Sequence, residues 1–590
     1  MKSIERISLA AVSLVLPACA PEAPAPYGAL PSKAQLEWQK METNMFVHFG
    51  PNTFTNAEWG DGTESEDVFA PADLDCRQWV ATAKAAGMKG VIITAKHHDG
   101  FCLWPNPVSR HTVAQSSWKD GSGDVLRELS DACREYGLKF GVYVSPWDRN
   151  DPHYGTDDYN DVFRRTLESA LGCYGDVFEQ WFDGACGEGP DGKRQVYDWE
   201  LFNSTVFRMQ PEAVIFSNVG PGCRWVGNEY GSAGSTCWGT MNIGELTPSS
   251  PADCDRLNQG EAGGERWVPA ETDVSIRPGW FWRESENSKV KSLDELLKIY
   301  YESVGRNSLL LLNVPADRRG HIHEIDSTRL MEFRAALDDI FAENLAEGAV
   351  ADATATRGGS RKFAAANLLD GDYDSFWAVD DDVLTPSVTV SFNSPKKFNR
   401  VVLQEYIPLG QRIAGFTIEA LSRDGLWHNI ASGTTVGYKR IVLVPQTEAT
   451  AVRVNIDEAL ACPVLNSLAV YQDDIYSGEP ETMAVAVGEV RPESEPLVAD
   501  LGEVRELSSF VYAPNDKGRG GCIITYDLLL SSDGENWEKV FSGRMFDNIV
   551  NNPLPQEVGL PGGFRARYVK LVPLRTSGDG SYGVAGFEVR

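Results

Sequence analysis

The sequence has few basic residues for its size. Its 590 residues include 54 Lys and Arg against 84 Asp and Glu, which leaves a formal net charge of −30 at pH 7. A nucleic-acid-binding surface needs a basic face that neutralises phosphates, so this balance argues against DNA or RNA as a partner. No run of 18 or more apolar residues occurs, so no membrane-spanning helix is expected.

Cysteine is also scarce, and several familiar motifs are missing. The 11 cysteines contain no CxxC pair and no regular spacing. This pattern predicts neither a zinc site nor a disulfide framework, and we expect mostly buried free thiols, with one or two disulfides left open. The absence of a P-loop and of a GxSxG elbow disfavours P-loop nucleotide binding and serine hydrolysis. We therefore expect no cofactor and no metal at the active site.

The N-terminus differs from the rest of the chain. Lys2 and Arg6 precede a mostly apolar stretch at 7–16, and Cys19 follows three residues after it. This order is typical of a secretory signal that ends in the lipidated cysteine of a bacterial lipoprotein. We expect residues 1–27 to be signal and tether, with Cys19 lipidated and ordinary signal cleavage as the alternative. The protein is then exported, and it meets a membrane only through this anchor.

Strand-like and helix-like segments alternate from residue 28 to residue 347. Several helix candidates end at a glycine that is followed directly by an apolar run, which is a common way to begin the next strand. Repeated strand–helix units predict an α/β fold with a parallel sheet. Eight strands fit a (β/α)8 TIM-like barrel, with an open doubly wound sheet as the alternative. The strand candidates are 45–50, 90–95, 138–145, 177–183, 213–218, 224–228, 273–276 and 308–314.

Beyond the barrel the pattern changes to short alternating segments separated by Gly, Asp, Asn and Pro. This pattern predicts two all-β sandwich domains, at 348–478 and 479–590. A weak internal repeat supports two related units. Segments 416–427 and 526–537 each carry a strand, an Asp-Gly hairpin turn and a Trp on the returning strand.

Two carboxyl groups stand out at the expected carboxyl ends of the barrel strands, where the active site of such a barrel lies. Asp183 and Glu229 end separate strands, and a retaining glycoside hydrolase needs two carboxyl groups about 5–5.5 Å apart, one nucleophile and one general acid. Glu179 shares a strand with Asp183 but lies about 13 Å deeper at about 3.3 Å per residue, so it is excluded. Glu188 and Asp191, in the following loop, remain alternatives for the acid.

Five segments together resemble the α-L-fucosidases of glycoside hydrolase family 29, over about residues 28–345. They are 46–50 (FVHFG), 58–60 (EWG), 96–101 (KHHDGF), 141–145 (GVYVS) and 181–184 (WFDG). The resemblance implies a retaining exo-α-L-fucosidase, with Asp183 as nucleophile and Glu229 as acid/base. Residues implied to hold the fucose are His48, Glu58, Trp59, His97, His98 and Tyr143.

Two further segments, 227–229 and 273–280, look like the branch of this family that acts on α-1,3- and α-1,4-linked fucose. Fucose carries one methyl group, and Trp59 or the pair Phe281 and Trp282 are expected to contact it. The general acid must keep its proton near neutral pH, so we expect a raised pKa for Glu229.

The two sandwiches resemble factor 5/8 type C, or discoidin-like, domains through segments 369–377, 422–427 and 531–537. Domains of this type often bind carbohydrate and some hold calcium, so a structural calcium ion is a candidate here and a bracing role is the alternative. For the whole chain two other functions stay open. They are another retaining glycosidase and a catalytically inactive, glycan-binding surface protein.

Overall fold

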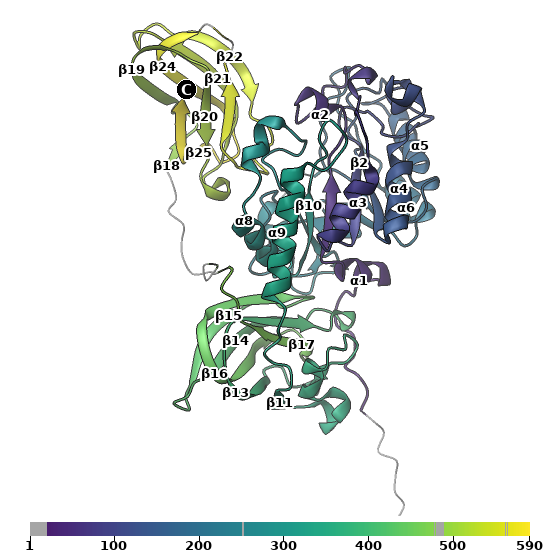
Figure 1. Cartoon of the computed structure of the whole chain (residues 1–590), viewed down its shortest axis with the longest axis vertical. Coiled ribbons are helices and arrows are strands. Elements are labelled where there is room, and N and C mark those ends of the chain that lie inside the picture. The colour runs from purple at the N-terminus through teal and green to yellow at the C-terminus, as the bar shows by residue number, and fades with distance from the viewer. Residues whose placement is uncertain (1–20, 251–252, 477, 479–488, 561, 563) are drawn as a thin grey trace, which may run out of the picture.

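The computed structural model describes residues 21–250, 253–476, 478, 489–560, 562 and 564–590. The predicted signal and Cys19 lie outside these residues. In the described part of the chain, no helix is both long enough and apolar enough to cross a membrane. A barrel carries one sandwich beneath it, and the C-terminal sandwich lies beside the upper part of the barrel (Figure 1).

Eight parallel strands close into the predicted barrel, in the order β1-β10-β9-β6-β5-β4-β3-β2. Each strand overlaps one of the eight segments expected from the sequence. The strands are β1 (Thr43–Val47), β2 (Gly90–Lys96), β3 (Lys139–Val144), β4 (Val177–Trp181), β5 (Val214–Ser217), β6 (Cys223–Trp225), β9 (Ala270–Ser275) and β10 (Ser308–Asn313). The short strands β7 (Thr240–Met241) and β8 (Arg266–Trp267) pair with each other outside the barrel.

Helices cover the outside of the barrel. Helix α4 illustrates how they begin and end: the Asp124 carboxylate accepts from the Arg127 N–H at its start, and Gly137 ends it with a φ of 74°. The helices are α1 (Lys33–Gln39), α2 (Pro51–Thr55), α3 (Cys76–Ala85), α4 (Val125–Tyr136), α5 (Asp158–Gly172), α6 (Trp199–Met209), α7 (Cys254–Gln259), α8 (Leu293–Glu302) and α9 (Glu324–Ile340).

The first sandwich is fused tightly to the lower end of the barrel. Val402 and Ile441 are buried in the same apolar cluster as the barrel helices. The buried Arg400 donates to Tyr301 of α8, so a charged side chain also ties the two units together. The strands are β11 (Val350–Ala353), β12 (Trp377–Ala378), β13 (Ser387–Glu405), β14 (Ile413–Leu421), β15 (Trp427–Gly433), β16 (Arg440–Ala459) and β17 (Val464–Tyr471).

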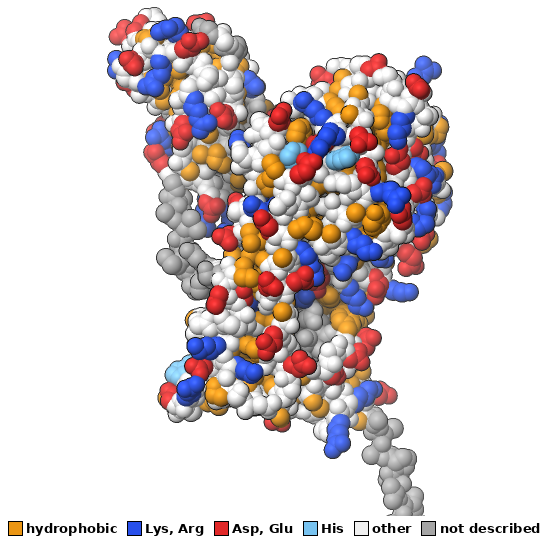
Figure 2. All heavy atoms as spheres, viewed as in Figure 1, with side chains coloured by type: hydrophobic (Ala, Val, Ile, Leu, Met, Phe, Trp, Pro, Cys, Tyr) orange, Lys and Arg blue, Asp and Glu red, His pale blue; other side chains and the backbone are white. Residues whose placement is uncertain are grey.

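The C-terminal sandwich has an apolar core of its own, distinct from that of the barrel. Its strands are β18 (Glu489–Pro492), β19 (Leu497–Glu506), β20 (Ser509–Ala513), β21 (Ile523–Ser531), β22 (Glu538–Met545), β23 (Gln556–Gly559), β24 (Arg565–Thr576), β25 (Ser581–Val584) and β26 (Gly586–Val589). On the face shown in Figure 2, acidic and basic side chains are interspersed over all three units.

The predicted internal repeat appears as two matching hairpins. Strands β14 and β15 pair in the first sandwich, and β21 and β22 pair in the second. Each returning strand carries its tryptophan at or next to its start, under a cation from the neighbouring long strand. Arg453 lies 4.1 Å from the ring centre of Trp427, and Lys570 lies 3.5 Å from that of Trp537. The ten cysteines in the described residues are free, and most are buried.

Candidate active site

A pocket of about 150 Å³ opens at the carboxyl ends of the barrel strands. Parallel strands bring their ends together there, so residues far apart in sequence share one cavity. Eight of the residues singled out in the sequence line it, namely His48, Glu58, Trp59, His97, His98, Tyr143, Asp183 and Glu229. The alternative acids lie outside this lining: Glu188 pairs with Arg194 and Asp191 with Lys193 in an exposed loop.

The expectation for Trp282 is not met by the structure. Its ring stacks on His323, with the centroids 5.9 Å apart, and it does not line the pocket. Trp280, two residues earlier in the same loop, lines it instead, with its ring 4.9 Å from that of His48. The Trp280 N–H donates to Glu58 Oε1 at 2.7 Å, which fixes the loop with Trp280 turned inward.

Sequence reasoning missed several further lining residues. Phe46, Trp181 and Asp273 stand inside segments that had been noted, but their own side chains were not singled out. Asn548 and Asn551 come from the C-terminal sandwich, and nothing in their local sequence signals a place in this pocket.

Three buried histidines form one wall of the pocket, and burial keeps them uncharged. It lowers the pKa of His48 from 6.5 to about 3 and that of His98 to about 4, the latter despite the nearby Asp183 carboxylate. The pKa of His97 is also well below its usual value, because of burial and the two neighbouring imidazoles. A neutral imidazole has one donor and one acceptor nitrogen, which suits the hydroxyl groups of a sugar.

Hydrogen-bond partners decide which nitrogen carries the proton in His48 and in His98. His48 Nδ1 lies 2.9 Å from Asn313 Oδ1, an acceptor, so Nδ1 is the donor and Nε2 is left as an acceptor. His98 Nδ1 lies 2.8 Å from Ser145 Oγ, whose own proton goes to a backbone carbonyl, so His98 has the same tautomer. His97 Nδ1 lies 3.5 Å from the Asn52 side-chain nitrogen, at the outer limit of a hydrogen bond.

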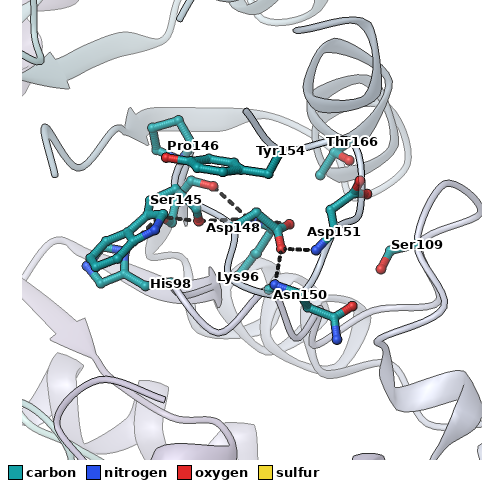
Figure 3. Close-up of polar contacts among 12 residues, drawn as sticks. Lys96, His98, Ser109, Ser145, Pro146, Asp148, Asn150, Asp151, Tyr154 and Thr166 are labelled. Carbon is teal, nitrogen blue, oxygen red and sulfur yellow. Dashed lines mark hydrogen bonds and ion pairs between the residues drawn. The ribbon is translucent and has the colours of Figure 1, made fainter. Parts of the chain in front are cut away.

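A buried ion pair contacts Ser145, the residue that is hydrogen-bonded to His98 (Figure 3). Lys96 Nζ lies 3.0 Å from Asp148 Oδ2 and also donates to the Ser145 carbonyl at 2.9 Å. The Asp148 carboxylate accepts the Asn150 N–H at 2.9 Å, so the pair is enclosed by further hydrogen bonds. The serine that orients His98 is therefore held in place by charge-assisted contacts.

Asp183 follows β4 and is oriented by two hydrogen-bond donors. The Tyr143 hydroxyl donates to Oδ2 at 3.1 Å, and the Ala185 N–H donates to Oδ1 at 2.8 Å. His98 Nε2 lies 3.6 Å from Oδ2. About a quarter of the Asp183 side chain remains exposed (27%), so its carboxylate is open to the cavity.

Glu229 follows β6 and faces the same cavity from a separate strand. Its Oε2 accepts from Trp280 Nε1 at 2.7 Å and from the Asn548 side-chain amide. Burial, together with the nearby Asp183 and Glu58, raises the pKa of Glu229 to about 8, although the two hydrogen bonds act in the opposite direction. This carboxyl group therefore keeps a proton at neutral pH, as a general acid must.

The pocket predicts a specific protonation pattern. In ¹⁵N NMR spectra of histidine-labelled protein at pH 6, His48, His97 and His98 should give neutral imidazole signals because burial disfavours their charged forms. His48 and His98 should show the Nδ1–H tautomer. Single His→Gln variants assign the signals, and an imidazolium signal from any of the three at pH 6 would contradict the electrostatics described.

Comparison with known proteins agrees with this geometry. The Alpha-L-fucosidase family model matches residues 27–338, more than half of the chain, and the F5/8 type C domain model matches 351–462 and 474–586. Alpha-L-fucosidase 1 of Arabidopsis thaliana is 41% identical over 483 residues, which is 80% of this chain and 94% of that protein.

Solved structures give the same result. A glycoside hydrolase 29 family member from an unknown rumen bacterium is 36% identical with a TM-score of 0.68, covering 96% of this chain and 100% of its own. A Ruminococcus gnavus GH29 fucosidase in complex with fucose is 31% identical with a TM-score of 0.70, covering 77% of this chain and 97% of its own. The chain therefore belongs to glycoside hydrolase family 29 and is an α-L-fucosidase that carries F5/8 type C domains.

Proposed function

We propose that this α-L-fucosidase acts as an exo-enzyme with retention of configuration, on fucose linked α-1,3 or α-1,4. The observation that supports it most directly is that two carboxyl groups from separate strands, Asp183 and Glu229, line the same pocket. Asp183 is oriented by Tyr143 and open to the cavity, whereas the half-buried Glu229 has a raised pKa and holds a proton. Two carboxyl groups in such different environments suit a nucleophile and an acid.

In the first proposed step, an Asp183 oxygen attacks C1 of the fucose and the glycosidic C–O bond breaks. Glu229 gives its proton to the departing oxygen, which leaves as an alcohol. In the second step, Glu229 takes a proton from a water molecule whose oxygen attacks C1, and the bond to Asp183 breaks. Two inversions at C1 give net retention.

The histidine wall supports recognition of a single small sugar. His48 and His98 offer Nε2 acceptors, as their hydrogen bonds require, and the neutral His97 has one donor and one acceptor nitrogen. Trp59 is 37% exposed at the rim, and its apolar face is available for the ring or the methyl group of fucose. A pocket walled in this way favours a terminal residue over an internal one.

A second cavity of about 210 Å³ supports a place for the leaving group. It shares Asp183 and Glu229 with the first pocket but none of the histidines. The scissile bond must lie between the two carboxyl groups, so the sugar that departs belongs on this side. Trp225, Asn218 and Asn551 form part of its wall and restrict what the site accepts.

Removal of the proposed acid should discriminate between leaving groups. Glu229→Ala should lower kcat/KM for a Lewis-type trisaccharide by about 10²–10⁴-fold, since its alcohol needs a proton to depart. An aryl fucoside with an acidic phenol should lose far less in the first step. Azide should accelerate turnover of the aryl fucoside and give α-fucosyl azide, because it needs no base and attacks the fucosyl–Asp183 intermediate with inversion, which restores the configuration of the substrate.

Glu188→Ala is the matched control, since that carboxylate pairs with Arg194 outside the pocket. It should behave like the unmodified enzyme on both substrates. Azide rescue of Glu188→Ala but not of Glu229→Ala would identify Glu188, in the exposed loop, as the general acid. It would contradict the assignment of that role to Glu229.

Linkage preference forms a separate prediction. Fucose linked α-1,3 or α-1,4 to N-acetylglucosamine should be released at least tenfold faster than fucose of 2′-fucosyllactose. The segments around Glu229 and Trp280 look like those of the branch with this preference, and the C-terminal sandwich narrows the mouth through Asn548 and Asn551. Liquid chromatography of released fucose under kcat/KM conditions measures the ratio, and equal rates would refute the linkage but not the fucosidase activity.

The remaining proposals concern parts of the chain away from the pocket. We keep export through the N-terminal signal and lipidation of Cys19, which lie outside the described residues, as a proposal. The sandwiches are proposed to brace the barrel or bind glycan, and to hold a structural calcium ion. The acidic turn at 370–374 does not form an EF-hand loop, because Ser375 stands where that loop needs glycine. In that turn Asp370 Oδ1 accepts the Asp372 N–H at 2.9 Å, so the backbone already uses one oxygen.

A further inference from the structure

The C-terminal sandwich reaches into the active site through one turn between β22 and β23, which we name the docking segment (residues 547–552). The carbonyl of Asn551 accepts the Glu229 N–H at 2.9 Å. The Asn552 side chain donates to the Pro278 carbonyl at 3.3 Å, and the Asn548 side chain donates to Glu229 Oε2. This sandwich therefore contacts both the backbone and the carboxyl group of Glu229.

The amide of Asn548 has only one orientation that satisfies its neighbours. Asn551 Nδ2 donates to Asn548 Oδ1 at 3.1 Å, which turns Nδ2 toward Glu229. The backbone of Asn548 has a φ of 47°, in the left-handed region that asparagine tolerates better than most residues. Such a backbone conformation costs free energy, so the surrounding structure must stabilise it.

Those surroundings are the core of the sandwich itself. Phe546 and Ile549, on either side of Asn548, are almost fully buried there, with 3% and 1% of their surface exposed. A second contact lies beside the first: Lys517, in the short helix η9 (Asp516–Gly518), has its Nζ 3.8 Å from Glu302 and 5.5 Å from the ring centre of Tyr230. The sandwich thus contacts both Glu229 and the residue that follows it.

We propose that Asn548 is a positioning residue for the general acid/base, so that the C-terminal sandwich completes the active site of the barrel. This inference rests on the proposed role of Glu229. The Asn548 amide holds the Glu229 carboxyl group in one orientation for proton delivery. It also stabilises the ionised form, which Glu229 must reach after it has given up its proton.

The other titratable groups around Glu229 stay unchanged in the variants below. Asp183 follows β4, Asp273 lies in β9 and Glu58 precedes Trp59 at the rim. Asp547 lies beside Asn548 in the docking segment, and Arg283 pairs with Glu58 at 2.7 Å. A change in pH dependence on substitution of Asn548 is therefore assigned to its own contact.

The test uses Asn548→Gly and Asn548→Asp in the full chain, since both residues accept a positive φ. Loss of the hydrogen bond should raise the pKa of Glu229, which then stays protonated to higher pH. In Asn548→Gly, the alkaline limb of the kcat/KM–pH profile should move upward from about pH 8 by about one pH unit. Asn548→Asp should move it further, because a second carboxylate disfavours the ionised form of Glu229.

The orientation of the Glu229 carboxyl group can be tested independently of its pKa, by comparing kcat on two substrates. On a Lewis-type trisaccharide Asn548→Gly should lose about tenfold to a hundredfold in kcat at the plateau, whereas an activated aryl fucoside loses much less. Asn552→Ala is the matched control, since its side chain bonds to the barrel backbone but not to Glu229. Asn552→Ala should change neither the alkaline limb of the kcat/KM–pH profile nor the ratio of kcat on the two substrates.

The proposal is overturned if neither Asn548 variant moves the alkaline limb, or if Asn552→Ala moves it equally. A failure of the underlying assignment looks different. If Glu229→Gln retains the alkaline limb, another group titrates there and Glu229 is not the acid, whatever the Asn548 variants do. Thermal unfolding of each variant confirms that folded enzymes are being compared.

Discussion

Burial of the Glu229 carboxyl group is the constraint on which the rest of the site depends. Desolvation and the neighbouring Asp183 and Glu58 favour its protonated form. The hydrogen bonds from Trp280 and Asn548 favour the ionised form and offset part of this effect, leaving a pKa of about 8. A group proposed to act first as an acid and then as a base needs this balance, because too high a pKa would prevent release of its proton.

The surroundings of the two carboxyl groups are kept largely free of positive charge. The three histidines of the pocket wall are neutral, so they form no ion pairs with the carboxylates. Below the pocket, burial raises the pKa of Glu179 to about 7 and that of its neighbour Glu271 well above the usual value. Trp38 Nε1 donates to Glu179 at 2.7 Å and so provides one hydrogen-bond donor for this buried pair of carboxyl groups.

The sequence was sufficient for the barrel because its strands follow from periodicity, whereas Glu58, Trp59 and the roles of the pocket residues came only from the resemblance to glycoside hydrolase family 29. All eight strands were located, and side chains at their carboxyl ends necessarily meet. Which tryptophan of the loop after β9 faces inward depends on the bond from the Trp280 N–H to Glu58, a contact that no local pattern encodes. Asn548 lies 319 residues from Glu229, and its place in the site follows only from how the C-terminal sandwich packs against the barrel.

The central claim is that Asp183 and Glu229 act together as nucleophile and acid/base, and trapping the covalent intermediate tests it most directly. A 2-deoxy-2-fluoro-α-L-fucosyl fluoride carries a good leaving group, while its fluorine at C2 slows the second step. Incubation followed by peptide mass spectrometry should place one fluorofucosyl group on Asp183, and Asp183→Asn should remain unlabelled. A label on another carboxylate, or steady turnover by Asp183→Asn with retention of configuration, would contradict the account.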